Sequence, residues 1–170
     1  MSSAPALYDK ALRMSYRIGR GEQGVLTFEP YKSMLLPLWR FRTVEIAKNS
    51  SADLWERFEE YGELGDFVGM DMARKYIQMV RYDPRQTLRQ PRRGRKYDKR
   101  SGKELQKSSS HIDHDAKLEA SEVFKQVWQQ CKAHEQYQKL KEQFLKEQKE
   151  WDKDHKSSGK AVKKEDADED

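Results

Sequence analysis

The sequence has little of what cross-links, anchors or interrupts a protein chain. It contains a single cysteine, Cys131, in 170 residues, so no disulfide can form within one chain. This excludes a small secreted domain held together by disulfides, and it favours a reducing compartment, the cytoplasm or the nucleus. There are only five prolines, which leaves long uninterrupted stretches in which helices can form.

Long apolar runs are also absent. The longest, residues 34–39, is far shorter than the about 20 residues that cross a membrane, so we expect no membrane partner. Hydrophobic residues make up 35% of the chain and charged residues 37%, whereas an average globular protein has about 45–50% and about 25%. Eleven of the eighteen aromatic residues lie in residues 1–80, so the core is expected there.

Net charge is missing from most of the chain. Residues 1–80 contain eleven basic and eleven acidic side chains, and residues 108–170 contain twelve basic and fifteen acidic ones. The excess lies in residues 81–107, with eleven Lys or Arg against three Asp or Glu, a local net charge of +8. A focused cationic segment on a nearly neutral body points to a polyanionic partner.

The basic segment gives the leading functional hypothesis. Lysine and arginine side chains bind DNA or RNA by displacing counterions from the phosphates, which makes binding salt-dependent. We predict a non-enzymatic module that binds nucleic acid or a ribonucleoprotein. A nuclear import signal and a solvated linker are the alternatives for this segment. The residues predicted to contact nucleic acid here are Arg92, Arg93, Arg95, Lys96, Tyr97, Lys99 and Arg100.

A second group of candidates alternates aromatic and arginine side chains: Trp39, Arg40, Phe41 and Arg42. Aromatic rings stack on bases, and arginine binds phosphate in a bidentate manner. In an extended segment, alternation places the rings on one side and the guanidinium groups on the other. The balanced charge of residues 1–80 favours the other interpretation, in which the rings belong to the core and the arginines pair with carboxylates. The candidate carboxylates are Glu22, Glu29, Glu45 and Asp66.

The predicted fold class is α+β and mostly helical, with a small N-terminal β-hairpin. The hairpin strands are expected at residues 16–18 and 25–28, where β-branched and aromatic residues flank a glycine-rich turn. A short helix is predicted over residues 5–14, and residues 31–36 are expected to form an irregular loop. We predict one compact domain over residues 1–152. Its parts are a core (16–82), a basic arm (83–112) and a long helix (115–152), followed by a disordered, acidic-ended tail (153–170).

Capping residues divide the helical middle. Thr43 is predicted to cap one helix, Ser50 and Asp53 to form a capping box for the next, and Asp66 to cap a third. Gly62 or Gly65 ends the second of these helices. In the long helix, the apolar stripe through Phe124 and the one through Tyr137 are out of phase. We therefore expect either a break near residues 133–134 or two halves that bury opposite faces.

The segment Gly19–Gly24 matches the G-x-G-x-x-G pattern of phosphate-binding loops. Its candidate phosphate contacts are Gly19, Arg20, Gly21 and Gly24, and a small nucleotide- or phosphate-binding enzyme using Arg17, Arg40 and Asp71 is the alternative function. The following residues favour a strand over the helix that a dinucleotide site requires, so a turn is the simpler interpretation. Asp71 and Arg74, three residues apart, are expected to pair on a helix surface.

Other residues give weaker signals. Metal ions often bind side chains of the types found at His111, Asp113, His114 and Asp115, but no Cys-x-x-Cys motif supports a structural metal site. We predict no metal, no cofactor and no catalytic residue. Cys131 lies on an apolar stripe and is expected to be buried. A protein-interaction scaffold through the long helix is a third possibility, which an exposed patch at Phe124/Trp128 or Phe144/Trp151 would favour.

Several segments together resemble a small domain family of unknown function with members in tailed phages, bacteria and fungi. They are YRIGRGEQGVLTFEPYKSMLLPLWRFRT, GDFVGMDMARKYIQM, GRKYD and EVFKQVWQQCKAHEQYQKLKE. The resemblance runs from about Tyr16 to Phe144. It implies that these residues form one unit with the basic arm integral to it, and it implies no activity, catalytic residue or cofactor.

Overall fold

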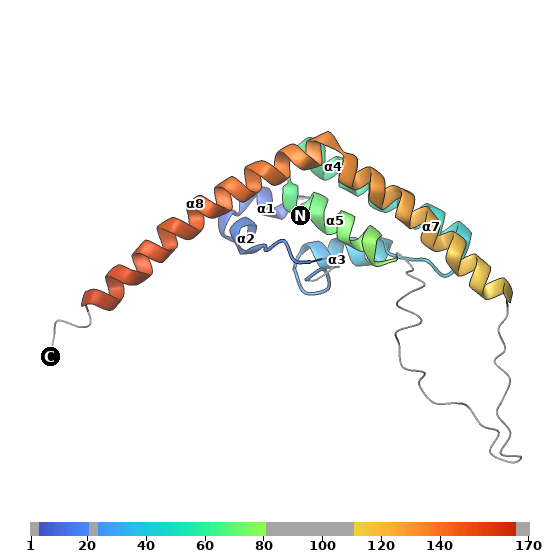
Figure 1. Cartoon of the computed structure of the whole chain (residues 1–170), viewed down its shortest axis with the longest axis horizontal. Helices are drawn as coiled ribbons and strands as arrows, with labels where there is room; N and C mark the ends of the chain where they lie inside the picture. The colour runs from blue at the N-terminus through green and yellow to red at the C-terminus, as the bar shows by residue number, and fades with distance from the viewer. Residues whose placement is uncertain (1–3, 21–23, 81–110, 166–170) are drawn as a thin grey trace, which may run out of the picture.

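The computed structural model describes residues 4–20, 24–80 and 111–165, with the side chains of the last range described from 116 to 155. Every regular element in these ranges is helical (Figure 1). The elements are α1 (Pro5–Tyr8), α2 (Lys10–Ser15), α3 (Tyr31–Leu35), the 3-10 helix η1 (Leu36–Leu38), α4 (Val44–Leu64), α5 (Phe67–Met79), α7 (His111–Ala133) and α8 (Glu135–Glu165).

The two longest helices, α7 and α8, meet at an angle and form a bent ridge, with the other helices on its concave side (Figure 1). Helices α4 and α7 run in the same direction, since Lys48 pairs with Glu119 at one end and Phe58 packs on His134 at the other. Helix α5 runs back between them and α3, while α1 and α2 lie against α8 (Figure 1).

The predicted N-terminal hairpin is wrong, and so is the α+β class, because the described residues contain no strand. Residues 16–18 belong to no helix or strand, and residues 24–27 form a turn. The backbone N–H groups of Thr27 and Phe28 both donate to the Gly24 carbonyl (3.2 Å each), so their hydrogen bonds are local. Val25 is instead buried beside α5, and its carbonyl accepts from the Tyr76 hydroxyl (3.3 Å). Burial against neighbouring helices, and not hydrogen bonding to another strand, therefore determines the conformation of these β-prone residues.

Helix α4 begins where the sequence predicts, but it does not divide. The Thr43 hydroxyl accepts from the Ile46 N–H (3.2 Å), and Gly65 ends the helix in the left-handed conformation at φ 78°. Ser50 and Ser51 lie within the continuous helix and are buried, so the capping box expected at Ser50 is wrong. The loop expected over residues 31–36 is also wrong, since α3 and the start of η1 occupy it.

Helix α5 confirms the predicted Asp66 cap, whose carboxylate accepts from the Gly69 N–H (3.1 Å). The glycine at position 69 is required by a close approach between α5 and α4. A Cβ atom at this position would lie 2.4 Å from ring atoms of Tyr61, which is closer than two such atoms can approach. Helix α5 has 13 residues, and those from Phe67 to Ile77 are all buried. It is therefore the central helix of the domain.

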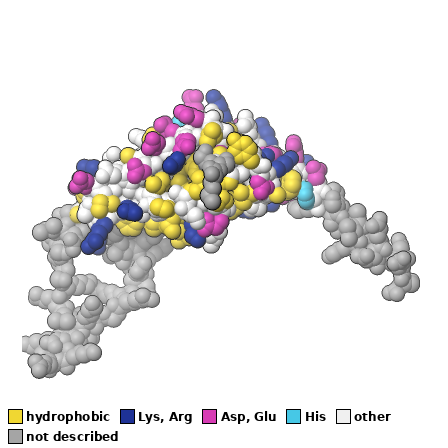
Figure 2. All heavy atoms as spheres, turned by 180° about the vertical axis from the view of Figure 1, so that it is seen from behind, with side chains coloured by type: hydrophobic (Ala, Val, Ile, Leu, Met, Phe, Trp, Pro, Cys, Tyr) yellow, Lys and Arg dark blue, Asp and Glu magenta, His cyan; other side chains and the backbone are white. Residues whose placement is uncertain are grey.

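The long C-terminal helix breaks at His134, as the phase of its apolar stripes predicts. Helix α8 then continues to Glu165, past residue 152, where the sequence analysis places the end of the long helix. Seen from behind, side chains of both charges are interspersed along the ridge of α7 and α8 (Figure 2).

The N-terminal helices are fastened to α8 by charged and polar contacts. Arg13 forms a bidentate pair with Glu147 (2.7 and 3.1 Å), and Arg17 forms one with Asp152 (2.7 and 2.8 Å). The buried amide of Gln148 donates to the carbonyl of Tyr16 (2.7 Å). Contacts separated by more than 130 residues therefore join the two ends of the domain.

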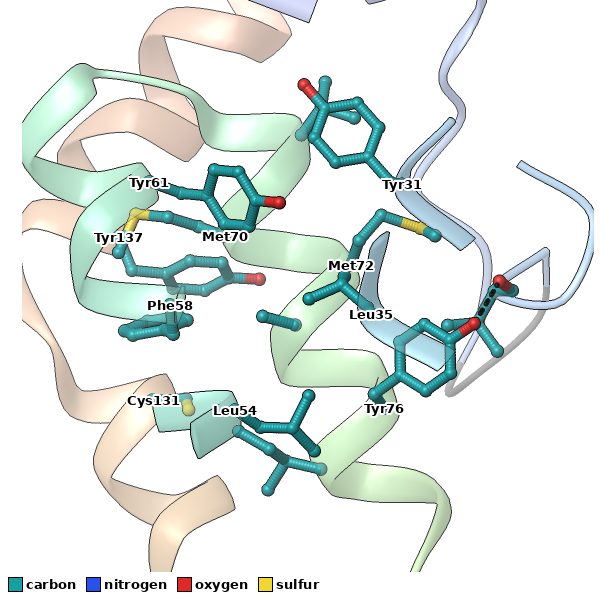
Figure 3. Packing of buried hydrophobic residues seen from close by; sticks show 14 of the residues in the cluster. Tyr31, Leu35, Leu54, Phe58, Tyr61, Met70, Met72, Tyr76, Cys131 and Tyr137 are labelled. Atoms are coloured by element: carbon teal, nitrogen blue, oxygen red, sulfur yellow. Dashed lines mark hydrogen bonds between the residues drawn. The ribbon is translucent and has the colours of Figure 1, made fainter. Parts of the chain in front are cut away.

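The core lies between α3, α4, α5, α7 and the start of α8 (Figure 3). Aromatic, methionine and leucine side chains from these helices interdigitate around Phe58 and Met70. Cys131 is fully buried there, and burial raises the pKa of its thiol to about 12, so it packs as a small apolar residue, as predicted. Among the helices described, none is long and apolar enough to cross a membrane.

Candidate nucleic-acid interface

The loop of residues 39–43 joins η1 to α4 and contains the exposed candidates of the sequence analysis. Ser50 fixes its geometry from inside α4. Its hydroxyl donates to the Leu38 carbonyl (2.6 Å) and accepts from the backbone N–H of Arg40 (3.0 Å). Both peptide groups that flank Trp39 are thus held by one buried serine, so the loop has a defined conformation.

The two aromatic rings of this loop, Trp39 and Phe41, pack against each other, with Trp39 on the side of the core. The Trp39 ring packs on Tyr76 of α5 (centroids 6.1 Å apart), and the Phe41 ring packs on Trp39 (5.0 Å, planes at 58°). Trp39 is half-buried, and its indole nitrogen is buried with no hydrogen-bond partner among the described residues. Phe41 is 43% exposed. The rings lie on the same side, as predicted for alternation, and they run from the core to solvent.

The two arginines of the loop remain exposed. The Arg40 Nε donates to the Pro37 carbonyl (3.2 Å), and neither Arg40 nor Arg42 forms an ion pair with any described residue. Two of the carboxylates considered as partners are engaged elsewhere: Glu29 binds Lys32 (2.9 Å), and Asp66 is buried and binds the Tyr31 hydroxyl. The described structure therefore contains two solvated guanidinium groups beside an exposed ring.

This loop lies at the end of the molecule where α5 finishes and α7 starts (Figure 1). In Figure 2 this end is on the left, where basic and hydrophobic side chains lie next to one another. The residues between α5 and α7 include the predicted basic arm up to residue 110. Arg92, Arg93, Arg95, Lys96, Tyr97, Lys99 and Arg100 all lie outside the described residues.

A second cluster of cations is buried around Asp71. Its carboxylate accepts hydrogen bonds from Tyr16 (2.5 Å), Tyr137 (2.7 Å) and Arg74 Nε (2.8 Å). The Lys75 ammonium lies 3.6 Å from the same carboxylate and 4.9 Å from the centre of the Tyr16 ring. The Asp71–Arg74 pair exists as predicted, but it is not on the surface: Asp71 is 0% and Arg74 8% exposed.

The electrostatics of this cluster favour a fixed, charged carboxylate. Burial alone would raise the pKa of Asp71, but the Arg74 charge, the Tyr16 hydrogen bond and the Lys75 charge hold it below its usual value. Burial and the Asp71 charge raise the pKa of Tyr16 and Tyr137, so both hydroxyls remain donors. Burial lowers the pKa of Lys75. The cluster connects the segment after α2, helix α5 and helix α8, and its acceptor is closed to solvent.

The residues proposed for a nucleotide-binding enzyme do not come together. Arg17 is bound to Asp152 of α8, Asp71 is fully buried, and Arg40 lies in the exposed loop between η1 and α4. Gly19 and Arg20 precede the turn and Gly24, at φ 85°, begins it, while Gly21 lies outside the described residues. No specific observation favours a phosphate loop here.

The aromatic patches that would favour an interaction scaffold are not exposed. Phe124 and Phe144 are buried, and Trp128 and Trp151 are half-buried against the core. In the described part of the chain, no group of three or more His, Cys, Asp or Glu side chains could hold a metal ion. The side chains of residues 111–115 fall outside that part.

Sequence reasoning missed three residues that build these two clusters. The S-x-x-D pattern predicts a cap at Ser50, although a serine on the buried face of a helix can also bond a neighbouring segment, as it does here. Tyr16 and Tyr137 were assigned to a strand and an apolar stripe. A buried tyrosine needs an acceptor for its hydroxyl, and Asp71 was the carboxylate available on the central helix.

Comparison with known proteins adds a family and no activity. The chain matches no protein among curated sequences and no solved structure. The model of one family, described as a domain of unknown function, DUF4385, matches residues 3–147. That span covers most of the chain and includes α1 to α5, α7, the first part of α8 and the basic segment. The chain therefore belongs to the family of the domain of unknown function DUF4385.

Proposed function

We propose that this protein is a non-enzymatic module that binds nucleic acid, alone or in a ribonucleoprotein, at the end of the molecule formed by the loop 39–43. The observation that supports it is the pair of exposed guanidinium groups of Arg40 and Arg42, which form no ion pair with any described residue and lie where α5 ends and α7 begins. The local charge of +8 in residues 81–107 is attached at the same end. Together they supply cations for a polyanion.

Most of the other described arginines are already neutralised; apart from the loop pair, only Arg20 is exposed with no ion pair to a described residue. Arg13, Arg17 and Arg57 are each bound to a carboxylate, and Arg74 and Lys75 are buried on Asp71. Charges already neutralised by the protein release few counterions when a phosphate approaches. The loop arginines keep their full charge available.

The test is a titration of labelled RNA and of duplex DNA with the full chain, at about 50 mM and about 200 mM salt. We expect affinity to fall steeply between the two, because each neutralised phosphate contributes a slope of about −0.7 for a single strand and about −0.9 for a duplex. Affinity that is unmeasurable at low salt, or that does not weaken with added salt, would refute the proposal.

Two variants locate the site. Replacing Arg92, Arg93, Arg95 and Lys96 by alanine removes four cations, and the single-strand salt slope should become shallower by about 2.8. In the double variant Arg40→Ala/Arg42→Ala, the single-strand salt slope should be shallower than that of the wild type by about 1.4. A matched control, Arg57→Ala/Lys146→Ala, removes the same charge from side chains paired with Glu60 and Glu142, and its slope should not change.

A further inference from the structure

We infer that the preferred ligand is single-stranded nucleic acid, with one unpaired base stacked on the ring of Phe41. This inference rests on the proposed function and narrows its ligand class. The residues involved are Phe41, the ring of Trp39 behind it, and the guanidinium groups of Arg40 and Arg42 on either side in sequence.

Phe41 is supported from behind and open in front. Its ring rests on Trp39, which rests on Tyr76 of the central helix, so three rings connect the surface to the core. A ring that is already packed on one side loses little conformational freedom when a base covers the other side. An exposed aromatic ring on a fixed backbone is the usual platform for a base in single-strand binding proteins.

The loop backbone around the ring is fixed as well. Ser50 holds the Leu38 carbonyl and the Arg40 N–H, so the peptide groups that precede Phe41 cannot rotate freely. The neighbouring arginines have no carboxylate partner among the described residues, which leaves them free to take the phosphates on each side of the stacked base. An apolar protein partner would leave these two charges without a counterpart.

The choice between single strand and duplex follows from access to the base face. In a duplex, both faces of a base are covered by neighbouring base pairs, so an exposed ring reaches only edges, sugars and phosphates. In a single strand the face is free. Lysine and arginine side chains bind the phosphates of single strands and duplexes alike, so a preference for single strands must come from stacking on Phe41. One base stacked on one aromatic ring corresponds to about a 5- to 150-fold change in affinity.

The experiment uses the full chain at one low salt concentration, with a labelled 20-nucleotide single strand and a duplex of the same length. Phe41→Ala should weaken single-strand binding by about 5- to 150-fold and leave duplex binding unchanged within about 2-fold. Phe41→Tyr keeps the ring and should retain wild-type affinity. Leu145→Ala is the matched control, since Leu145 is also exposed (46%) but lies on α8 far from the loop.

An abasic oligonucleotide tests the same contact from the ligand side. It keeps the phosphates and lacks the bases, so it should bind the wild-type protein as weakly as the intact strand binds Phe41→Ala. This arm does not depend on the folding of any variant.

The outcomes separate the two proposals. Stacking on Phe41 is refuted if Phe41→Ala does not weaken single-strand binding more than duplex binding and the abasic strand binds the wild-type protein with the affinity of the intact strand. Salt-dependent binding would still stand in that case. If no oligonucleotide binds at low salt, both the proposed function and this inference are refuted.

Discussion

Two pairs of cations in this protein have nearly the same chemistry and opposite surroundings. Arg74 and Lys75 are buried in the central helix and share the carboxylate of Asp71. Arg40 and Arg42 lie in the loop before α4, exposed and without an ion pair in the described structure. The balanced charge of residues 1–80 favoured internal pairing for both. The structure buries Arg74 and Lys75 on the carboxylate of Asp71 and leaves Arg40 and Arg42 exposed, so the place of a cation in the fold decides whether its charge stays available.

The largest expected effect comes from breaking the buried side of this comparison. Asp71→Asn keeps the shape of the side chain but removes the buried negative charge that Arg74 pairs with. Removing one partner of a buried ion pair costs about 3–5 kcal/mol of unfolding free energy. Denaturation in urea measures it. Glu60→Gln, which removes the partner of exposed Arg57, is the control and should cost less than about 1 kcal/mol; equal effects would mean that burial at Asp71 does not matter.

Acid should weaken the same cluster reversibly. The pKa of Asp71 is lower in the folded state than in the unfolded chain, so its contribution to stability is present above its ordinary pKa and is lost as the pH falls through the folded value. The unfolding free energy should therefore decrease below about pH 4. Glu147, whose pKa is lowered by its bond with Arg13, contributes with the same sign. The decrease should be shallower in Asp71→Asn, and an identical pH profile in that variant would contradict the assignment.

A smaller effect is expected where the fold holds the exposed loop. Ser50→Ala leaves the Leu38 carbonyl and the Arg40 N–H without their partner and should cost about 1–3 kcal/mol. Ser51→Ala is the neighbouring control, because the Ser51 hydroxyl bonds only within α4, to the Lys48 carbonyl (2.9 Å). The affinity of Ser50→Ala for nucleic acid should fall together with its stability, which calorimetry and titration can compare. Similar losses of stability in both variants would show that Ser50 does not hold the loop.

The smallest effect on stability is expected from the exposed pair itself. Arg40→Ala/Arg42→Ala removes no ion pair, so the unfolding free energy should change by less than about 0.5 kcal/mol. The melting temperature measures this on the same preparation used for binding. A large loss of stability would mean that these arginines are structural, and it would remove them from the proposed interface.

The helical part of the fold follows from local signals in the sequence. The cap residues Thr43, Gly65 and Asp66 each mark an observed helix end, and the break at His134 is one of the two arrangements that the phase of the apolar stripes predicts. These signals depend on residues a few positions apart, so a single sequence is enough to identify them.

The failures have a common cause in long-range contacts. The run Val25–Phe28 has β-propensity, but its burial against α5 and the Tyr76 bond decide its conformation. Asp71 looks like a surface residue beside Arg74, yet Tyr16 and Tyr137, 55 and 66 residues away, close over it. No spacing along the chain encodes such meetings. The exposed state of Arg40 and Arg42 could not be predicted for the same reason, because it depends on which carboxylates other elements occupy.

The bond between Arg13 and Glu147 has a consequence for how the protein is made. The N-terminal helices leave the ribosome first, but the surface that receives them is synthesised 134 residues later. Until then the Tyr16 ring, which packs on Phe28, lacks the Phe144 ring that completes its burial. A chain interrupted before α8 would lack the Glu147 and Gln148 bonds to Arg13 and Tyr16, and proteases that survey nascent proteins would reach α1 and α2 more readily.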